Sequence, residues 1–182
     1  MLLLGCRPKG RYTEQHDVFF SVGKTIADLV PEIVAFWPEV KGIIHVDAWR
    51  QVTQIDGYNI AVADKSEEPA KDELCDLRLY FINLGGYRKN EFEEYHYKTV
   101  VVAPTKAMAI KQAKETVFYK HTGFKGAPSH IDDKYGIDVD DLWDIKEILS
   151  PAVKSKYNIS ITPASSIKED ELHLGYFKLD KL

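Results

Sequence analysis

The fold is decided by LRLYFINLGGY at residues 77–87 and EYHYKTVVVA at residues 94–103. The apolar runs 77–84 and 96–103 are rich in β-branched and aromatic residues, a composition typical of strands. A glycine pair follows the first run and Pro104 follows the second. We therefore expect two strands, with Gly85 and Gly86 forming a tight turn of positive φ at the start of a polar loop that reaches Tyr95.

The next segment, TKAMAIKQAKETVF at residues 105–118, changes to helical periodicity. Its apolar positions Met108, Ile110, Ala113 and Val117 stand at helical spacing. Thr105 is suited to the first turn. The order is therefore strand, strand, helix.

The first half of the chain repeats this order at an offset of 80 residues. Glu14-Gln15-His16 returns as Glu94-Tyr95-His96, and Leu4-Gly5 returns as Leu84-Gly85. A constant offset of this kind indicates an internal duplication. The first half accordingly predicts strands at 1–4 and 16–22, a helix at 25–37, and strands at 49–55 and 58–63 joined by an Asp56-Gly57 hairpin turn.

Later echoes occur at larger offsets. His45-Val46-Asp47 matches His130-Ile131-Asp132, and Tyr58-Asn59-Ile60 matches Tyr157-Asn158-Ile159. In the second half the final strands are expected at 143–149 and 157–162. We therefore expect an α+β fold of two tandem β-β-α-β-β repeats, related by a pseudo-twofold, with helices packed on antiparallel sheet. The expected divisions are a first repeat at 1–63, a linker at 64–76, a second repeat at 77–163, and an extension at 164–182 with an extra strand at 171–179.

Composition restricts the class of protein. The 182 residues are 45% hydrophobic and 29% charged, with a net charge of −4 and two cysteines. This predicts a folded cytoplasmic protein without a disulfide framework. The negative charge and the lack of a long apolar run argue against nucleic acid and membrane as partners.

Four blocks resemble a bacterial family known only as a domain of unknown function, number fifteen forty-three. They are LYFINLGGY (79–87), EYHYKTVVVA (94–103), HIDDKYGIDVDDL (130–142) and QIDGYNIAV (54–62). The resemblance extends over nearly the whole chain and implies the duplication and the α+β fold. It implies no activity and no cofactor. The chain departs from the family at Cys6, where the first repeat lacks the second glycine.

The candidate site combines histidines with carboxylates two residues away. Residues i and i+2 of a strand lie on one face, so each pair can present both groups together. Imidazole and carboxylate are ligands of zinc, manganese and iron, and they also make acid–base pairs. The candidate residues are Glu14, His16, His45, Asp47, Glu94, His96, His130 and Asp132, with Gly85, Gly86 and Tyr87 as an adjoining loop.

Three interpretations of these residues remain. In the first, the pairs form a polar latch in which carboxylates and histidines satisfy each other's hydrogen bonds. In the second, they form part of a binding or interaction module, with a site between the two repeats for a small molecule or a protein. Alternatively, they serve a metal-dependent or His/carboxylate acid–base enzyme acting on a small polar substrate. No zinc-protease or nucleophile motif is present, so the sequence assigns no catalytic residue and no cofactor. The pseudo-twofold also makes a homo-oligomer conceivable.

Overall fold

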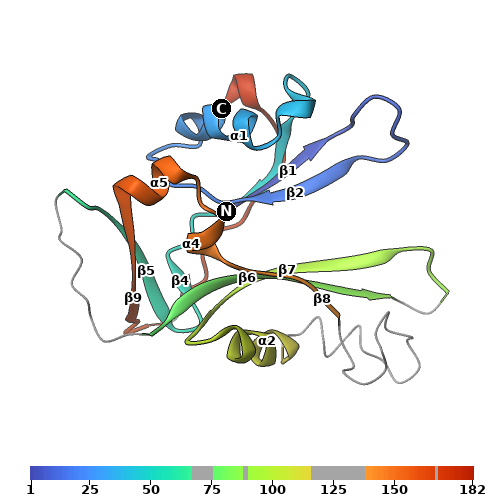
Figure 1. Cartoon of the computed structure of the whole chain (residues 1–182). Helices are drawn as coiled ribbons and strands as arrows, with labels where there is room; N and C mark the ends of the chain where they lie inside the picture. Colours follow the sequence, from blue (N-terminus) through green and yellow to red (C-terminus); the bar gives the residue numbers. More distant parts are fainter. Residues whose placement is uncertain (67–75, 88–89, 116–137, 167) are drawn as a thin grey trace. The chain divides into compact units, whose positions relative to one another are not determined.

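The computed structural model describes residues 1–66, 76–87, 90–115, 138–166 and 168–182 (Figure 1). The chain divides into two compact units. Unit 1 comprises Met1–Ala70 and Leu149–Leu182, and unit 2 comprises Lys71–Ile148. Each unit is described separately below.

Unit 1 contains most of the strands. Its elements are β1 (Leu2–Cys6), β2 (Gln15–Phe19), η1 (Ala27–Leu29), α1 (Val30–Phe36), η2 (Pro38–Val40), β3 (His45–Trp49), β4 (Gln54–Ile55), β5 (Tyr58–Asp64), α5 (Pro151–Lys156), β9 (Tyr157–Pro163), β10 (His173–Lys178) and η3 (Leu179–Lys181). Unit 2 contains β6 (Arg78–Tyr87), β7 (Glu94–Ala103), α2 (Lys106–Lys114), β8 (Asp138–Asp144) and α4 (Ile145–Ile148).

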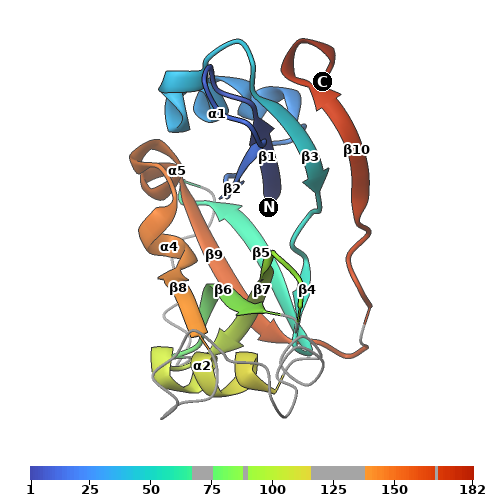
Figure 2. The same cartoon turned by 90° about the vertical axis from the view of Figure 1, so that its right-hand side faces the viewer.

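The main sheet of unit 1 has the order β10-β3-β1-β2, and all its pairings are antiparallel. Figure 2 shows β10 running alongside β3 at one edge. Alternate residues of β1, namely Leu2, Leu4 and Cys6, are buried in one core with Ile33 of α1. Gly5 therefore lies on the opposite face of the sheet.

A second sheet in unit 1 has the order β4-β5-β9. The predicted hairpin turn between β4 and β5 is confirmed, with φ of 53° at Asp56 and 80° at Gly57. In the β5–β9 pair, Ala61 lies opposite Ser160. Ser160 is also the residue that follows Ala61 by 99 positions, the offset of the echo between Tyr58 and Tyr157. Each strand residue therefore pairs as expected if a local twofold axis passed between Ala61 and Ser160.

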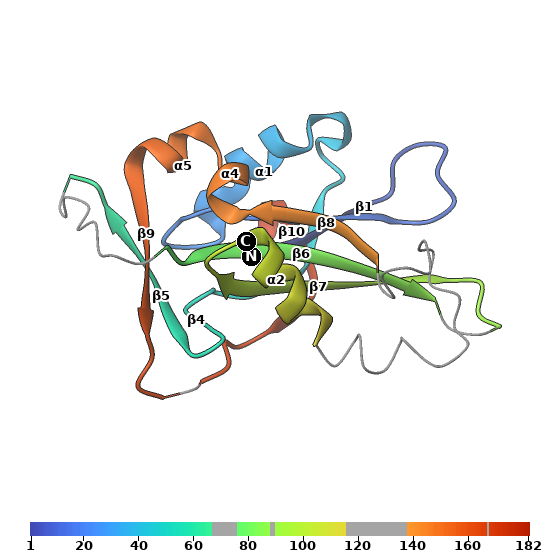
Figure 3. The same cartoon turned by 60° about the horizontal axis from the view of Figure 1, so that its bottom comes forward.

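Unit 2 is a three-stranded antiparallel sheet of order β7-β6-β8 with α2 packed on one face (Figure 3). The core joins Tyr80, Ile82 and Leu84 of β6 to Ala109 and Ala113 of α2. Helix α2 begins as expected, because the Thr105 side chain accepts a hydrogen bond from the Met108 amide. The α+β class predicted from the sequence is confirmed.

The offset of 80 residues is preserved in the strand pairing. Gly5 pairs with His16 in unit 1, and Gly85 pairs with His96 in unit 2. Both units also share the order strand, strand, helix, strand. The full β-β-α-β-β repeat and its pseudo-twofold remain predictions.

Four local predictions are wrong. Of the strand expected at 49–55, only Trp49, which ends β3, and β4 (Gln54–Ile55) are strand, and residues 50–53 connect them. Gly85 and Gly86 lie inside β6, not in a tight turn, and neither has a positive φ. The expected strand at 143–149 is largely replaced by α4, because Ile145 and Leu149 are both buried and stand one helical turn apart. Met108 is 53% exposed, since α2 instead buries the small residues Ala109 and Ala113 against the sheet.

The late strands contribute to unit 1. β9 pairs with β5, and β10 pairs with β3. Within the segment 171–179, where an extra strand was expected, the structure has β10, which borders β3 at the edge of the main sheet. The division of the sequence into repeats at 63, 77 and 163 remains a prediction, because duplication in sequence and compactness in space are different properties.

Within the described ranges, no helix has the length and apolar character needed to cross a membrane.

Burial predicts how the core of unit 1 responds to truncation. Ile33→Ala removes a fully buried side chain and should lower the free energy of unfolding by about 2–5 kcal/mol. The matched change Ile43→Ala, at a side chain 47% exposed, should cost less than about 1 kcal/mol. Urea unfolding followed by circular dichroism measures both. Equal losses would contradict the assignment of Ile33 to the core.

Candidate metal centre

The first cluster is built on three adjacent strands of unit 1. Gly5 of β1 pairs with His16 of β2 on one side and with His45 of β3 on the other. Paired residues of neighbouring strands point to the same face. Because the central residue has no side chain, the two flanking imidazoles and the nearby carboxylates meet above it.

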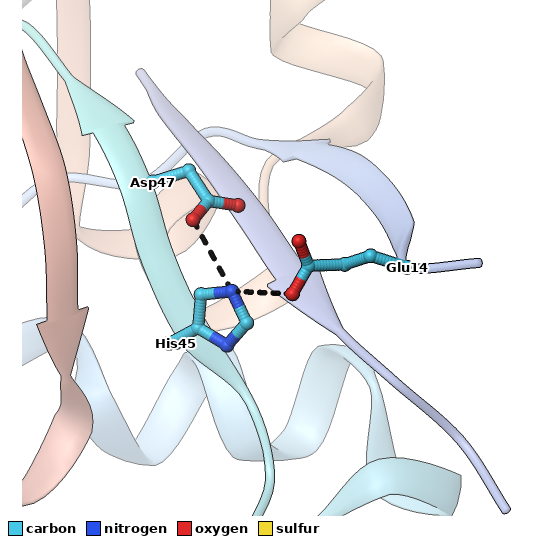
Figure 4. Close-up of side chains that lie close together, drawn as sticks. All are labelled: Glu14, His45 and Asp47. Atoms are coloured by element: carbon cyan, nitrogen blue, oxygen red, sulfur yellow. Dashed lines mark ion pairs between the residues drawn. The ribbon is translucent and has the colours of Figure 1, made fainter.

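The four candidate residues of the first repeat lie close together. His45 Nε2 lies 3.0 Å from Glu14 Oε1 and 3.2 Å from Asp47 Oδ1 (Figure 4). His16 Nε2 lies 3.5 Å from Glu14 Oε2 and 3.3 Å from Asp47 Oδ2. Each carboxylate therefore contacts both imidazoles.

A β-bulge directs Asp47 into this cluster. Leu4 pairs with Val46 and Leu3 pairs with Ala48, so Asp47 has no partner on β1. An extra residue of this kind bends the strand and turns its side chain. Asp47 and His45 come from one strand two residues apart, and beyond Asp47 the strand returns to regular pairing with β1 at Ala48.

Burial differs across the cluster. The His45 side chain is 4% exposed, whereas those of Glu14 and His16 are about 40% exposed. Both ring nitrogens of His45 and Oδ2 of Asp47 are buried without a hydrogen-bond partner. The short distances to the carboxylates therefore do not correspond to directed hydrogen bonds from the imidazole.

Tyr176 of β10 covers His45. The two ring centroids are 4.2 Å apart. The sequence analysis did not identify this residue, because β10 has no counterpart in the repeat pattern. Its position became apparent only from the pairing of β10 with β3.

Unit 2 contains a related cluster. His96 Nδ1 lies 3.0 Å from Asp140 Oδ2, and His96 Nε2 lies 3.8 Å from Glu94 Oε2. Leu84 pairs with Val139 and Asn83 pairs with Asp141, so Asp140 occupies a bulge like that of Asp47. The ligand atoms of Glu94, His96 and Asp140 all lie within 4.8 Å of one another.

His130 and Asp132 lie outside the described residues. By strand pairing, the structural counterpart of His45-Val46-Asp47 is Asp138-Val139-Asp140, because Gly5 pairs with His45 and Gly85 pairs with Asp138. The sequence analysis missed Asp140. The shared Val-Asp pair, followed in both halves by a tryptophan, was the signal that could have identified it.

Each cluster has a glycine at its centre because the side chains of the cluster occupy the space that a Cβ would need. A Cβ on Gly5 would lie 2.5 Å from His45 Nε2 and closer still to Asp47 Oδ2. A Cβ on Gly85 would lie 2.5 Å from Asp140 Oδ2. Gly85, Gly86 and Tyr87 thus belong to strand β6, with Gly85 directly against Asp140 of the cluster, and not to a loop.

Comparison with known proteins supports the resemblance noted from the sequence. Residues 11–62 match the family described as "Domain of Unknown Function (DUF1543)". This match over the first repeat supports the resemblance of the chain to the DUF1543 family. All four cluster residues of unit 1 fall within the matched segment. No curated protein matches the chain.

The fold is similar to that of a solved structure described as "Crystal structure of a protein Il1583 from Idiomarina loihiensis". The TM-score is 0.64 at 24% sequence identity, and the alignment covers 98% of this chain and 94% of that one. At this identity the likeness concerns the fold alone.

The close approach above Gly5 predicts a coupled cost. Gly5→Ala should lower the free energy of unfolding by about 1–3 kcal/mol, because the new methyl group displaces Asp47 and His45. In an Asp47→Ala background the same change should cost less. A double-mutant cycle in urea measures the coupling. Strictly additive costs would show that the contact with Asp47 is not the cause.

Proposed function

We propose that this protein is a binding module for a divalent transition-metal ion, held in unit 1 by Glu14, His16, His45 and Asp47. The observation that carries the proposal is His45. Its ring is almost fully buried, neither nitrogen has a hydrogen-bond partner, and Nε2 faces two carboxylates. Buried polar groups without partners are rare, and an ion at this point would provide one.

The donor set fits such an ion. Two imidazoles and two carboxylates are ligands that zinc, iron and manganese accept. A tetrahedral zinc with bonds of about 2.0–2.2 Å places neighbouring ligand atoms about 3.3–3.6 Å apart. His45 Nε2 lies 3.0 Å from Glu14 Oε1 and 3.2 Å from Asp47 Oδ1, close to that spacing. His16 Nε2 instead faces the second oxygen of each carboxylate, so it would complete the set from the rim.

Charge balance also supports the proposal. With neutral imidazoles, Glu14 and Asp47 bring two negative charges to one place, beside a histidine shielded from solvent. A divalent cation would neutralise both. The latch interpretation instead requires the imidazoles to donate to the carboxylates, and His45 makes no directed hydrogen bond to either one.

The exposed side of the cluster supports a second candidate, a metal-dependent enzyme acting on a small polar substrate. Structural zinc sites are closed by four protein ligands, whereas catalytic sites keep one position for water or substrate. Glu14, His45 and Asp47 form the compact ligand triad, and the more exposed His16 lies at its rim. His16 distinguishes the binding module from the enzyme. If the His16→Ala variant still binds the metal, the site has three protein ligands and an open position, as a catalytic site requires.

Metal analysis tests the proposed function. Purified untagged protein dialysed against Zn²⁺ should bind the ion through unit 1 and unfold at a higher temperature, since a ligand at about 100 times its Kd stabilises by about 2.7 kcal/mol. His45→Ala should abolish this binding. Mass spectrometry of the metal content and thermal unfolding provide the two measurements.

His173→Ala is the matched control. This histidine lies in the same unit but stacks on Trp49, with centroids 3.8 Å apart, away from the cluster. It should leave the metal content unchanged. If His45→Ala prevents folding, the isosteric change Glu14→Gln at a half-exposed side chain replaces it. An absence of bound metal together with destabilisation by His45→Ala would support the latch and refute the metal site.

A further inference from the structure

The duplication repeats the cluster geometry in unit 2 but changes its chemistry. A glutamate, a histidine and a bulged aspartate recur around a central glycine, as Glu94, His96, Asp140 and Gly85. The fourth position differs. Where His45 pairs with Gly5, Asp138 pairs with Gly85, so a carboxylate residue replaces the second imidazole.

A second replacement acts in the same direction. Position 3 of the first repeat is leucine, and its counterpart at the offset of 80 is Asn83. Asn83 lies two residues before Gly85 and therefore on the same face of β6. Its Nδ2 lies 3.3 Å from His96 Nδ1, while its Oδ1 is buried without a hydrogen-bond partner. The amide therefore adds a polar group beside the cluster that the first repeat lacks.

We propose that unit 2 holds a second cation in a site around Glu94, His96 and Asp140, and that this site favours Zn²⁺ over harder ions such as Mn²⁺ less strongly than the site in unit 1 does. Imidazole-rich sets favour zinc and its neighbours, whereas carboxylate and carbonyl oxygens suit manganese, magnesium and calcium. By register, the two repeats differ in residue type at positions 3 and 83 and at positions 45 and 138. This inference rests on the proposed function, because it treats the cluster in unit 1 as a metal site that the duplication repeats. The experiments measure the two sites separately.

The first experiment uses the full chain carrying His45→Ala, so that only unit 2 is measured. This protein should bind one Mn²⁺ per chain, counted from the loss of the free-ion signal in electron paramagnetic resonance. Adding Glu94→Gln should remove that binding, whereas the neighbouring control Glu93→Gln should not. Circular dichroism establishes that each variant is folded, and Glu14→Gln serves as the background if His45→Ala is not.

The second experiment tests the selectivity by a gain of function. In the His45→Ala background, Asp138→His restores the second histidine and should raise the Zn²⁺ affinity of unit 2 by about tenfold or more. Isothermal titration with ZnCl₂ measures the change. Unchanged Zn²⁺ affinity, or Mn²⁺ binding unaffected by Glu94→Gln, would overturn the inference.

The outcomes separate the two proposals. Zn²⁺ bound by wild-type protein and lost with His45→Ala, together with no Mn²⁺ bound to that variant, would leave the proposed function intact and refute the second site. Mn²⁺ bound through Glu94, with no Zn²⁺ dependent on His45, would refute the proposed function and support the second site.

Discussion

The missing side chain of Gly5 is the constraint on which the first cluster depends. Side chains from the two strands that flank a central one meet above the residue between them, and a Cβ on that residue would occupy the space in which they meet. With glycine there, His16 and His45 meet the same two carboxylates above one backbone position. The core faces the other side of the sheet, where Leu4 and Cys6 are buried. The same strand thus serves stability with one set of alternating residues and the site with the other.

Much of this arrangement could be predicted from local sequence. The 80-residue echo predicted equivalent strand pairs, and His16 and His96 do pair with glycines at that offset. The Asp56-Gly57 turn and the Thr105 start of α2 were also predictable, since short-range backbone preferences determine both. The convergence of Glu14, His16, His45 and Asp47 followed from i, i+2 geometry once the strands were placed.

The remaining features depend on non-local pairing, which the sequence pattern does not record. Asp140 entered the second cluster through a bulge on β8, a strand separated from β6 by more than fifty residues. His130 was the more conspicuous match because histidine is rare, whereas the structurally equivalent residue at that row is Asp138. The glycine pair was interpreted as a turn because glycine usually permits positive φ. At Gly85 the requirement is instead room for the Asp140 carboxylate.

The interrupted chain of unit 1 has a consequence for the order of events on the ribosome. Unit 2 is one continuous segment that is complete when residue 148 has been made, whereas unit 1 needs β9 and β10 from the end of the chain. Domains generally fold as units as they emerge during synthesis. The segment made first is therefore completed last. His45 can receive the ring of Tyr176 above it only after unit 2 and the segment that follows it have been made.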